Sequence, residues 1–125
     1  MYKVLGVGTD LCRIDRMRER LGDERFLSRC FTEAERAWIH SRGVMAADSL
    51  AGLWAAKEAV LKALGTGLQL PMLSVEIGHT ELGQPVCSLS GRALERCADG
   101  EVLVSVTHEG DMACAFCVWQ GDDGR

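Results

Sequence analysis

The sequence lacks the features that mark a membrane protein or a nucleic-acid-binding protein. No apolar run approaches the roughly 18–20 residues of a transmembrane helix, and the opening MYKVLGVGTD does not resemble a signal peptide. The formal net charge of -4 argues against general nucleic-acid binding, because domains that bind nucleic acid are usually basic. We therefore expect a soluble, cytoplasmic protein that binds neither a membrane nor a nucleic acid.

The sequence contains cysteines, but their spacing is not that of a metal site. Only Cys114 and Cys117 form a C-x-x-C pair, and a structural zinc site needs a second such pair or histidines at set spacing. This pair also falls in a strand-like run, where residues three apart point to opposite faces. We expect the six cysteines to be small core residues in a reducing compartment.

The hydrophobic pattern is typical of a single α+β domain over residues 1–125. Hydrophobic residues make up 47% of the chain, which is enough for a real core. Periodicity predicts helices at about 11–21, from about 33, at 49–64 and at 91–100. Alternation predicts strands at 3–11, 74–79, 85–90, 101–108 and 111–119. The predicted helix-terminal residues are Asp10, Thr32 with Glu35, Asp48 or Ser49, and Gly65 at a C-terminus.

The stretch WAAKEAVLKALGTGL, residues 54–68, carries charge on a helix that is otherwise apolar. At about 100° per residue, Lys57 falls in the middle of the apolar stripe, and Glu58 and Lys62 lie together at its edge. One interpretation is a snorkelling Lys57 beside a surface ion pair. The other is an anionic site along this edge, where glycines let the backbone approach phosphate closely.

Asp10 is the second candidate carboxylate. The stretch LGVGTDL begins like a dinucleotide-binding fingerprint, but its third glycine position holds Leu11 and no βαβ pattern follows. What remains is a carboxylate just past a strand, which also suits a helix N-cap. Asp10 and Glu58, from separate elements and with lysines and glycines nearby, suit a divalent metal ion that holds phosphate.

Two other features favour binding, and each has a plain alternative. His108 lies at the turn of the hairpin SVTHEGD, where it is placed to bind phosphate or move a proton unless it is only solvated. The predicted helix at 11–21 has a basic face that suits an acidic helical partner, unless it is only a solvated charged helix. That face consists of Arg13, Arg16 and Arg20, with an exposed Met17 beside them.

Together these stretches resemble the holo-acyl-carrier-protein synthase family, the small bacterial phosphopantetheinyl transferases. The resemblance spans nearly the whole chain in the family's order and spacing, and W-x-x-K-E-A-x-x-K also resembles the equivalent helix of larger transferases. The matching stretches are GVGTDL with Ile14 and Arg16, FTEAE at 31–35, LAGLWAAKEAVLKALGTG at 50–67, GQP at 83–85 and VSVTHEGDMACAFCV at 104–118.

The resemblance implies a fold, a reaction and an assembly. The fold would be phosphopantetheinyl-transferase-like, with an antiparallel sheet packed against helices. The enzyme would transfer 4'-phosphopantetheine from coenzyme A to a serine of an apo acyl carrier protein, in fatty acid biosynthesis, and release adenosine 3',5'-bisphosphate. The family uses Mg²⁺ and is commonly a homotrimer with each site between two subunits, so that Asp10 and Glu58 can come from different chains.

The resemblance also implies roles for particular residues. Asp10 and Glu58 would hold Mg²⁺, and Lys62 would contact the diphosphate. Glu58, or a water that it orients, is the candidate general base. We expect Lys57 to reach the same anionic site, although a buried carboxylate partner is the alternative. The implied nucleotide contacts are Gly65, Thr66 and Gly67, with Thr107 and His108 near the 3'-phosphate. The implied carrier-docking residues are Arg13, Arg16, Met17 and Arg20.

Two departures from the family pattern remove positive charge. Leu53 and Gln84 stand where many members have a basic residue. These changes bear on the contacts with the nucleotide more than on the reaction. The alternatives are a module that binds coenzyme A without transfer, a transferase for a specialised carrier, and a metal-dependent hydrolase of nucleotide diphosphates.

Overall fold

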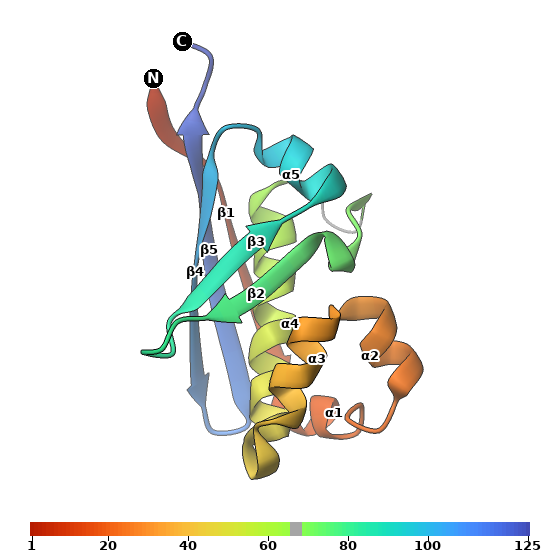
Figure 1. Ribbon diagram of the computed structural model, residues 1–125. Helices are drawn as coiled ribbons and strands as arrows, with labels where there is room; N and C mark the ends of the chain where they lie inside the picture. Colours follow the sequence, from red (N-terminus) through yellow and green to blue (C-terminus); the bar gives the residue numbers. More distant parts are fainter. Residues whose placement is uncertain (66–68) are drawn as a thin grey trace.

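The computed structural model describes residues 1–65 and 69–125 and has an α+β fold (Figure 1). The strands are β1 (Tyr2–Arg13), β2 (Val75–His79), β3 (Pro85–Leu89), β4 (Glu101–Glu109) and β5 (Met112–Asp122). The α-helices are α1 (Ile14–Arg18), α2 (Glu24–Cys30), α3 (Glu33–His40), α4 (Ala46–Ala63) and α5 (Gly91–Cys97). Short 3₁₀ turns, η1 (Gly43–Met45) and η3 (Met72–Ser74), precede α4 and β2.

Both sheets are antiparallel, as expected. The larger one has the order β1-β5-β4, and the β2–β3 hairpin forms the other. The long helix α4 lies between the three-stranded sheet and helices α1–α3, with the hairpin close to its middle (Figure 1). Most of its residues are buried, so α4 is the central element of the core. Among the described residues, no helix combines the length and apolarity needed to cross a bilayer.

Two glycines explain why α4 lies so close to β1. A Cβ atom on Gly6 would lie 2.0 Å from the Ala63 carbonyl oxygen, and one on Gly8 would lie 2.0 Å from that of Ala59. No side chain fits there, so helix and strand backbones are in direct contact. The glycines of GVGTDL therefore serve helix–sheet packing.

Helix α3 begins where the sequence predicts. Thr32 is its N-cap, and its hydroxyl accepts a hydrogen bond from the Glu35 N–H at 3.2 Å. The Glu35 carboxylate in turn accepts from the Thr32 N–H at 2.9 Å, which completes the predicted capping box. Local sequence is enough to set this boundary.

Helix α4 ends as predicted but begins earlier. Gly65 follows its C-cap with φ +76°, a conformation that favours glycine. The N-cap is Met45, so the prediction that Asp48 or Ser49 caps this helix is wrong. Both residues lie inside its first turns because the 3₁₀ turn at Gly43–Met45 leads directly into the helix.

The predicted helix at 11–21 is largely wrong. Residues 11–13 extend β1, where Leu11 pairs with Cys114 and Arg13 with Met112. Leu11 is therefore 65% exposed rather than buried, and Asp10 lies in the strand rather than at an N-cap. Pairing with β5 outweighs the helical pattern, a tertiary effect that local periodicity does not encode. A further helix, α2, begins after Asp23, whose side chain accepts from the Phe26 N–H.

The face of the three-stranded sheet away from α4 carries exposed apolar side chains. Their positions alternate along the strands with buried residues of the other face, as the register requires. The exposed members are Val7, Leu11, Leu103 and Phe116, and we call them the outer face. Cys114 and Cys117 follow the same alternation: Cys117 is buried and Cys114 half-buried, and all six cysteines are free.

Candidate functional site

Strand β1 and helix α4 bring Asp10 and Lys62 together. The Lys62 ammonium donates to Asp10 Oδ1 at 3.0 Å and to the Thr9 carbonyl oxygen at 3.0 Å. The two charged side chains are 49% and 16% exposed, so the pair lies at the surface with Asp10 more enclosed. Within the described residues, Lys62 forms its salt bridge with Asp10. Helical periodicity had instead suggested a surface pair between Glu58 and Lys62.

Glu58 lies in the same electrostatic environment. Partial burial raises the pKa of the Glu58 carboxyl, the negative charge of Asp10 raises it further, and the Lys62 ammonium lowers it. Asp10 is therefore close enough to Glu58 in one chain to oppose ionisation of the Glu58 carboxyl. One ammonium beside two carboxylates leaves an excess negative charge that a divalent cation would offset.

The donor set fits Mg²⁺ better than a fully protein-enclosed metal. Mg²⁺ usually takes one or two protein carboxylates and completes its shell with substrate phosphates and water. Among the described residues, no group of three or more His, Cys, Asp or Glu side chains could hold a metal ion. Asp10 and Glu58 thus provide the two-carboxylate arrangement that leaves the rest of a shell to a phosphate ligand.

Lys57 does not reach this site, so that expectation is wrong. Its side chain is 0% exposed, and its ammonium donates to Glu35 Oε1 at 2.5 Å. The Phe31 ring lies 5.2 Å from Lys57 Nζ, and the other Glu35 oxygen accepts from the Ile77 N–H at 2.8 Å. Burial lowers the pKa of the Lys57 ammonium, whereas Glu35 opposes that change. The alternative expectation, a buried carboxylate partner for Lys57, is confirmed, and that partner is Glu35.

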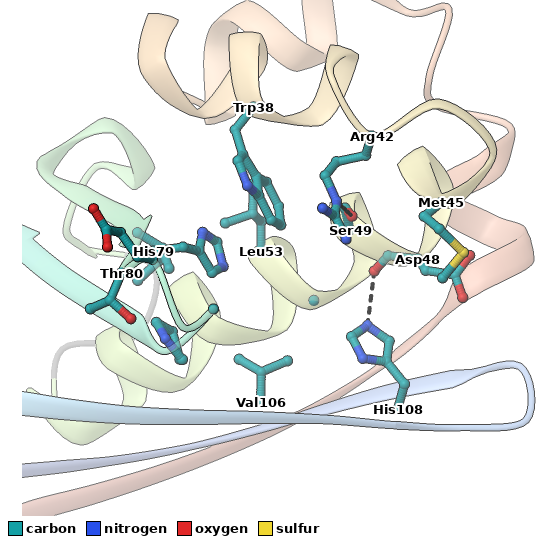
Figure 2. A pocket seen from close by; sticks show the side chains of 15 residues that line it. Trp38, Arg42, Met45, Asp48, Ser49, Leu53, His79, Thr80, Val106 and His108 are labelled. Atoms are coloured by element: carbon teal, nitrogen blue, oxygen red, sulfur yellow. Dashed lines mark hydrogen bonds between the residues drawn. The ribbon is translucent and has the colours of Figure 1, made fainter.

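His108 faces α4 and lines a pocket of about 540 Å³ (Figure 2). Its Nε2 lies 2.9 Å from the Asp48 carbonyl oxygen. Gly52 makes room for the ring, because a Cβ there would come within 3.2 Å of Nε2. Thr107, which pairs with Cys114, points to the opposite face of β4 from His108. The side chains of Thr107 and His108 in one chain therefore do not contact the same ligand.

Sequence reasoning missed three other residues of this pocket. Trp38 and His79 stack with ring centroids 4.0 Å apart, and the Arg42 guanidinium lies 5.3 Å from the Trp38 ring centroid (Figure 2). Burial lowers the pKa of His79, and the charge of Arg42 lowers it further. These residues come from α3, the segment after it and the end of β2, and no sequence spacing links them. Leu53 also lines the pocket.

The Gly65 turn follows α4 directly, and Thr66 and Gly67 lie outside the described residues. The Arg96 guanidinium donates to the Leu64 carbonyl oxygen at 2.8 Å. A cation at the C-terminus of a helix offsets the negative end of its dipole. Arg96 therefore supplies positive charge at the C-terminal end of α4.

The predicted basic surface is only partly as expected. Arg13, Arg16 and Arg20 are exposed, but Arg13 ends β1 and Arg20 follows α1, where it pairs with Asp23 at 3.1 Å. Met17 is 1% exposed and belongs to the core, so the expectation of an exposed methionine is wrong. Because α1 is short and packs against α4, Met17 faces inward between the arginines.

Comparison with known proteins identifies one family. A family model for the 4'-phosphopantetheinyl transferase superfamily matches residues 6–117. A holo-[acyl-carrier-protein] synthase of Cereibacter sphaeroides is 43% identical, with 92% of this chain and 91% of the relative covered. One from Protochlamydia amoebophila is 40% identical, with 92% and 97% covered.

Solved structures show the same fold. A Bacillus anthracis holo-(acyl-carrier-protein) synthase in complex with CoA (3',5'-ADP) superimposes with a TM-score of 0.81 at 29% identity, covering 95% of this chain and 98% of that one. A Helicobacter pylori holo-[acyl-carrier-protein] synthase in complex with coenzyme A gives 0.76 at 25% identity, covering 89% and 96%.

Proposed function

The chain belongs to the holo-acyl-carrier-protein synthases of the 4'-phosphopantetheinyl transferase superfamily, and we propose a magnesium-dependent reaction for it. The substrates are coenzyme A and an apo acyl carrier protein. The carrier serine oxygen attacks the phosphorus attached to pantetheine and forms the new P–O bond. The P–O bond to the second phosphate breaks, its electrons leave with adenosine 3',5'-bisphosphate, and the serine proton passes to a base.

The observation that carries this proposal is the meeting of Asp10, Glu58 and Lys62. Asp10 and Glu58 would hold Mg²⁺, because the negative charge of Asp10 acts on Glu58 and a cation between them would relieve that repulsion. A bound Mg²⁺ would supply positive charge that offsets the charge of the diphosphate. Lys62, already 3.0 Å from Asp10 and half exposed, turns its ammonium to the diphosphate. Asp10 and Glu58 lie near each other within one chain, so a single subunit is able to supply both carboxylates.

Glu58 is the proposed proton acceptor, directly or through a water that it orients. A bound Mg²⁺ would lower the pKa of a Glu58 carboxyl that ligates it, which favours the route through a water that Glu58 orients. Lys62 then positions the diphosphate for attack. Positioning of the reacting groups contributes much of the catalysis in phosphoryl-type transfer.

The pocket beside His108 is the proposed site of the nucleotide end of coenzyme A. His108 contributes near the 3'-phosphate, and Gly65 lies along the nucleotide. Arg42 lines the same pocket and provides positive charge where Leu53 does not. Thr107 faces the other side of the sheet, so its contact is with a nucleotide at a neighbouring subunit.

The outer face supports a homotrimer. Val7, Leu11, Leu103 and Phe116 are between 47% and 65% exposed on one contiguous sheet surface, and a second subunit would bury them. The proposed docking surface for the carrier consists of the exposed Arg13, Arg16 and Arg20. Their positive charges attract an acidic carrier. Met17 supports this surface from the core.

Mass spectrometry of the carrier tests the proposal. The protein is mixed with Mg²⁺, coenzyme A and an apo carrier, and the expected mass gain is one phosphopantetheine. EDTA or Glu58→Gln abolishes the gain. No gain with several carriers, despite coenzyme A binding, would instead identify a binding module.

A further inference from the structure

We infer that Gly8 is a positioning residue for the metal site, an inference that rests on the proposed function. Gly8 lies two residues before Asp10 on the same face of β1. A Cβ at Gly8 would lie 2.0 Å from the Ala59 carbonyl oxygen and 2.7 Å from the Ala63 backbone nitrogen. Strand and helix backbones thus approach more closely at Gly8 than any side chain permits.

The contacts of Gly8 are adjacent in sequence to the site residues. Ala59 follows Glu58, and Ala63 follows Lys62, so the helix backbone that rests on Gly8 is the backbone that carries both charged side chains. Real Cβ atoms essentially never come within 3.0 Å of such atoms, so a methyl group at Gly8 would move α4 from β1 by at least about 1 Å.

That separation sets the span of the site. Asp10 belongs to the strand, whereas Glu58 and Lys62 belong to the helix, so every distance between the two groups crosses this interface. Glu58 lies one turn before Lys62 on α4. The 3.0 Å contact of Lys62 with Asp10 requires the close approach of strand and helix. Gly8 therefore holds the two carboxylates close enough for one small cation, without contacting it.

A merely structural role would have a different signature. Gly100 provides the matched control, because its Cβ would lie 2.3 Å from the Gln120 carbonyl oxygen, a comparable backbone clash away from α4. If Gly8 serves only the fold, Gly8→Ala and Gly100→Ala lower the melting temperature similarly and change metal affinity similarly. If Gly8 positions the site, only Gly8→Ala changes metal affinity.

The test is binding of Mn²⁺ alone, measured by electron paramagnetic resonance on folded protein. We expect Gly8→Ala to weaken Mn²⁺ binding on the order of tenfold, because a shift of about 1 Å misplaces one ligand. Gly100→Ala should stay within about twofold of the wild type. Equal Mn²⁺ affinity in Gly8→Ala and the wild type, or equal weakening in both variants, would overturn the inference.

A second pair of variants covers the case in which Gly8→Ala does not fold. Ala59→Val enlarges the buried helix residue whose carbonyl oxygen lies against Gly8, and Ala51→Val, at an equally buried position of the same helix, is its control. Weakened Mn²⁺ binding only in Ala59→Val supports the inference, and equal effects overturn it. The wild type and Glu58→Gln report on the proposed function separately: Mn²⁺ binding that Glu58→Gln abolishes upholds the metal site whatever the Gly8 result.

Discussion

Helix α4 carries two lysine ion pairs that differ in burial and in the freedom of their partners. Lys57 and Glu35 are both 0% exposed, and Glu35 accepts two further backbone hydrogen bonds. Lys62 and Asp10 are 49% and 16% exposed, and a second carboxylate lies nearby. The first pair joins α4 to α3 and β2 and cannot rearrange without unfolding. The second is open to solvent and can exchange partners, so the proposed reaction involves Lys62 and not Lys57.

The buried pair gives the largest expected effect. Lys57→Met leaves Glu35 charged and without its ammonium partner in the core, which should cost about 3–5 kcal/mol of unfolding free energy. Lys57→Met combined with Glu35→Leu removes both charges and should recover much of that loss. Urea unfolding measures both quantities.

The double variant is the decisive comparison for the buried pair. It also removes the capping-box acceptor at Thr32 and the acceptor for the Ile77 N–H, so recovery will be incomplete. A single Lys57→Met variant as stable as the wild type would show that the core tolerates the lone carboxylate, and the contrast between the pairs would fail.

Lys62→Gln should show the opposite pattern. Because the Lys62–Asp10 pair is partly exposed, its loss should change stability by no more than about 1 kcal/mol. Transfer to the carrier should fall roughly 100-fold, since a charged contact to the reacting diphosphate is lost. Unfolding and steady-state kinetics on one preparation separate the two effects. A large stability loss with unchanged turnover would make Lys62 a second structural lysine.

Arg16→Glu extends the comparison to a cation that acts through another protein. Arg16 is exposed on α1, so the fold should tolerate reversal of its charge. We expect KM for the carrier to rise about tenfold, because like charges now oppose docking. KM for coenzyme A should stay nearly unchanged. Arg92→Glu on α5 is the matched control, and equal losses for both substrates would contradict docking by Arg16.

Sequence patterns predicted the elements whose boundaries are set locally. The capping box at Thr32 and the glycine after α4 both lie where the pattern placed them. The extension of β1 to Arg13 was missed because its pairing partners lie about a hundred residues away on β5. Lys57 looked like a ligand because a helical wheel shows its face but not the Glu35 that covers it.

The site was predicted in the same uneven way. Resemblance to the family placed Asp10, Glu58 and Lys62 in one site, and the structure brings all three together. Trp38, Arg42 and His79 meet only through packing of α3 against the β2–β3 hairpin, and nothing in their spacing signals it.

The smallest expected effect concerns the pH dependence of stability in the metal-free enzyme. The raised pKa of Glu58 means that the folded state binds its proton more tightly than the unfolded state does. Its stabilising contribution is present below the ordinary carboxyl pKa of about 4.3 and is lost as pH rises through the folded pKa. Glu58→Gln should therefore be more stable than the wild type near pH 7, by less than about 1 kcal/mol, and should lose that advantage at acid pH.

Urea unfolding in EDTA, at several pH values between acid and neutral, measures this difference, with the exposed Glu95→Gln as the control. A ligand that binds only the folded state raises its stability, so adding Mg²⁺ should stabilise the wild type and not Glu58→Gln. The order of the two proteins at pH 7 should then reverse. A Glu58→Gln variant that is less stable than the wild type in EDTA would place Glu58 in a stabilising pair, like Glu35. Glu58 would then stabilise the fold as Glu35 does. Neither carboxylate would be free to exchange its partner for a metal ion.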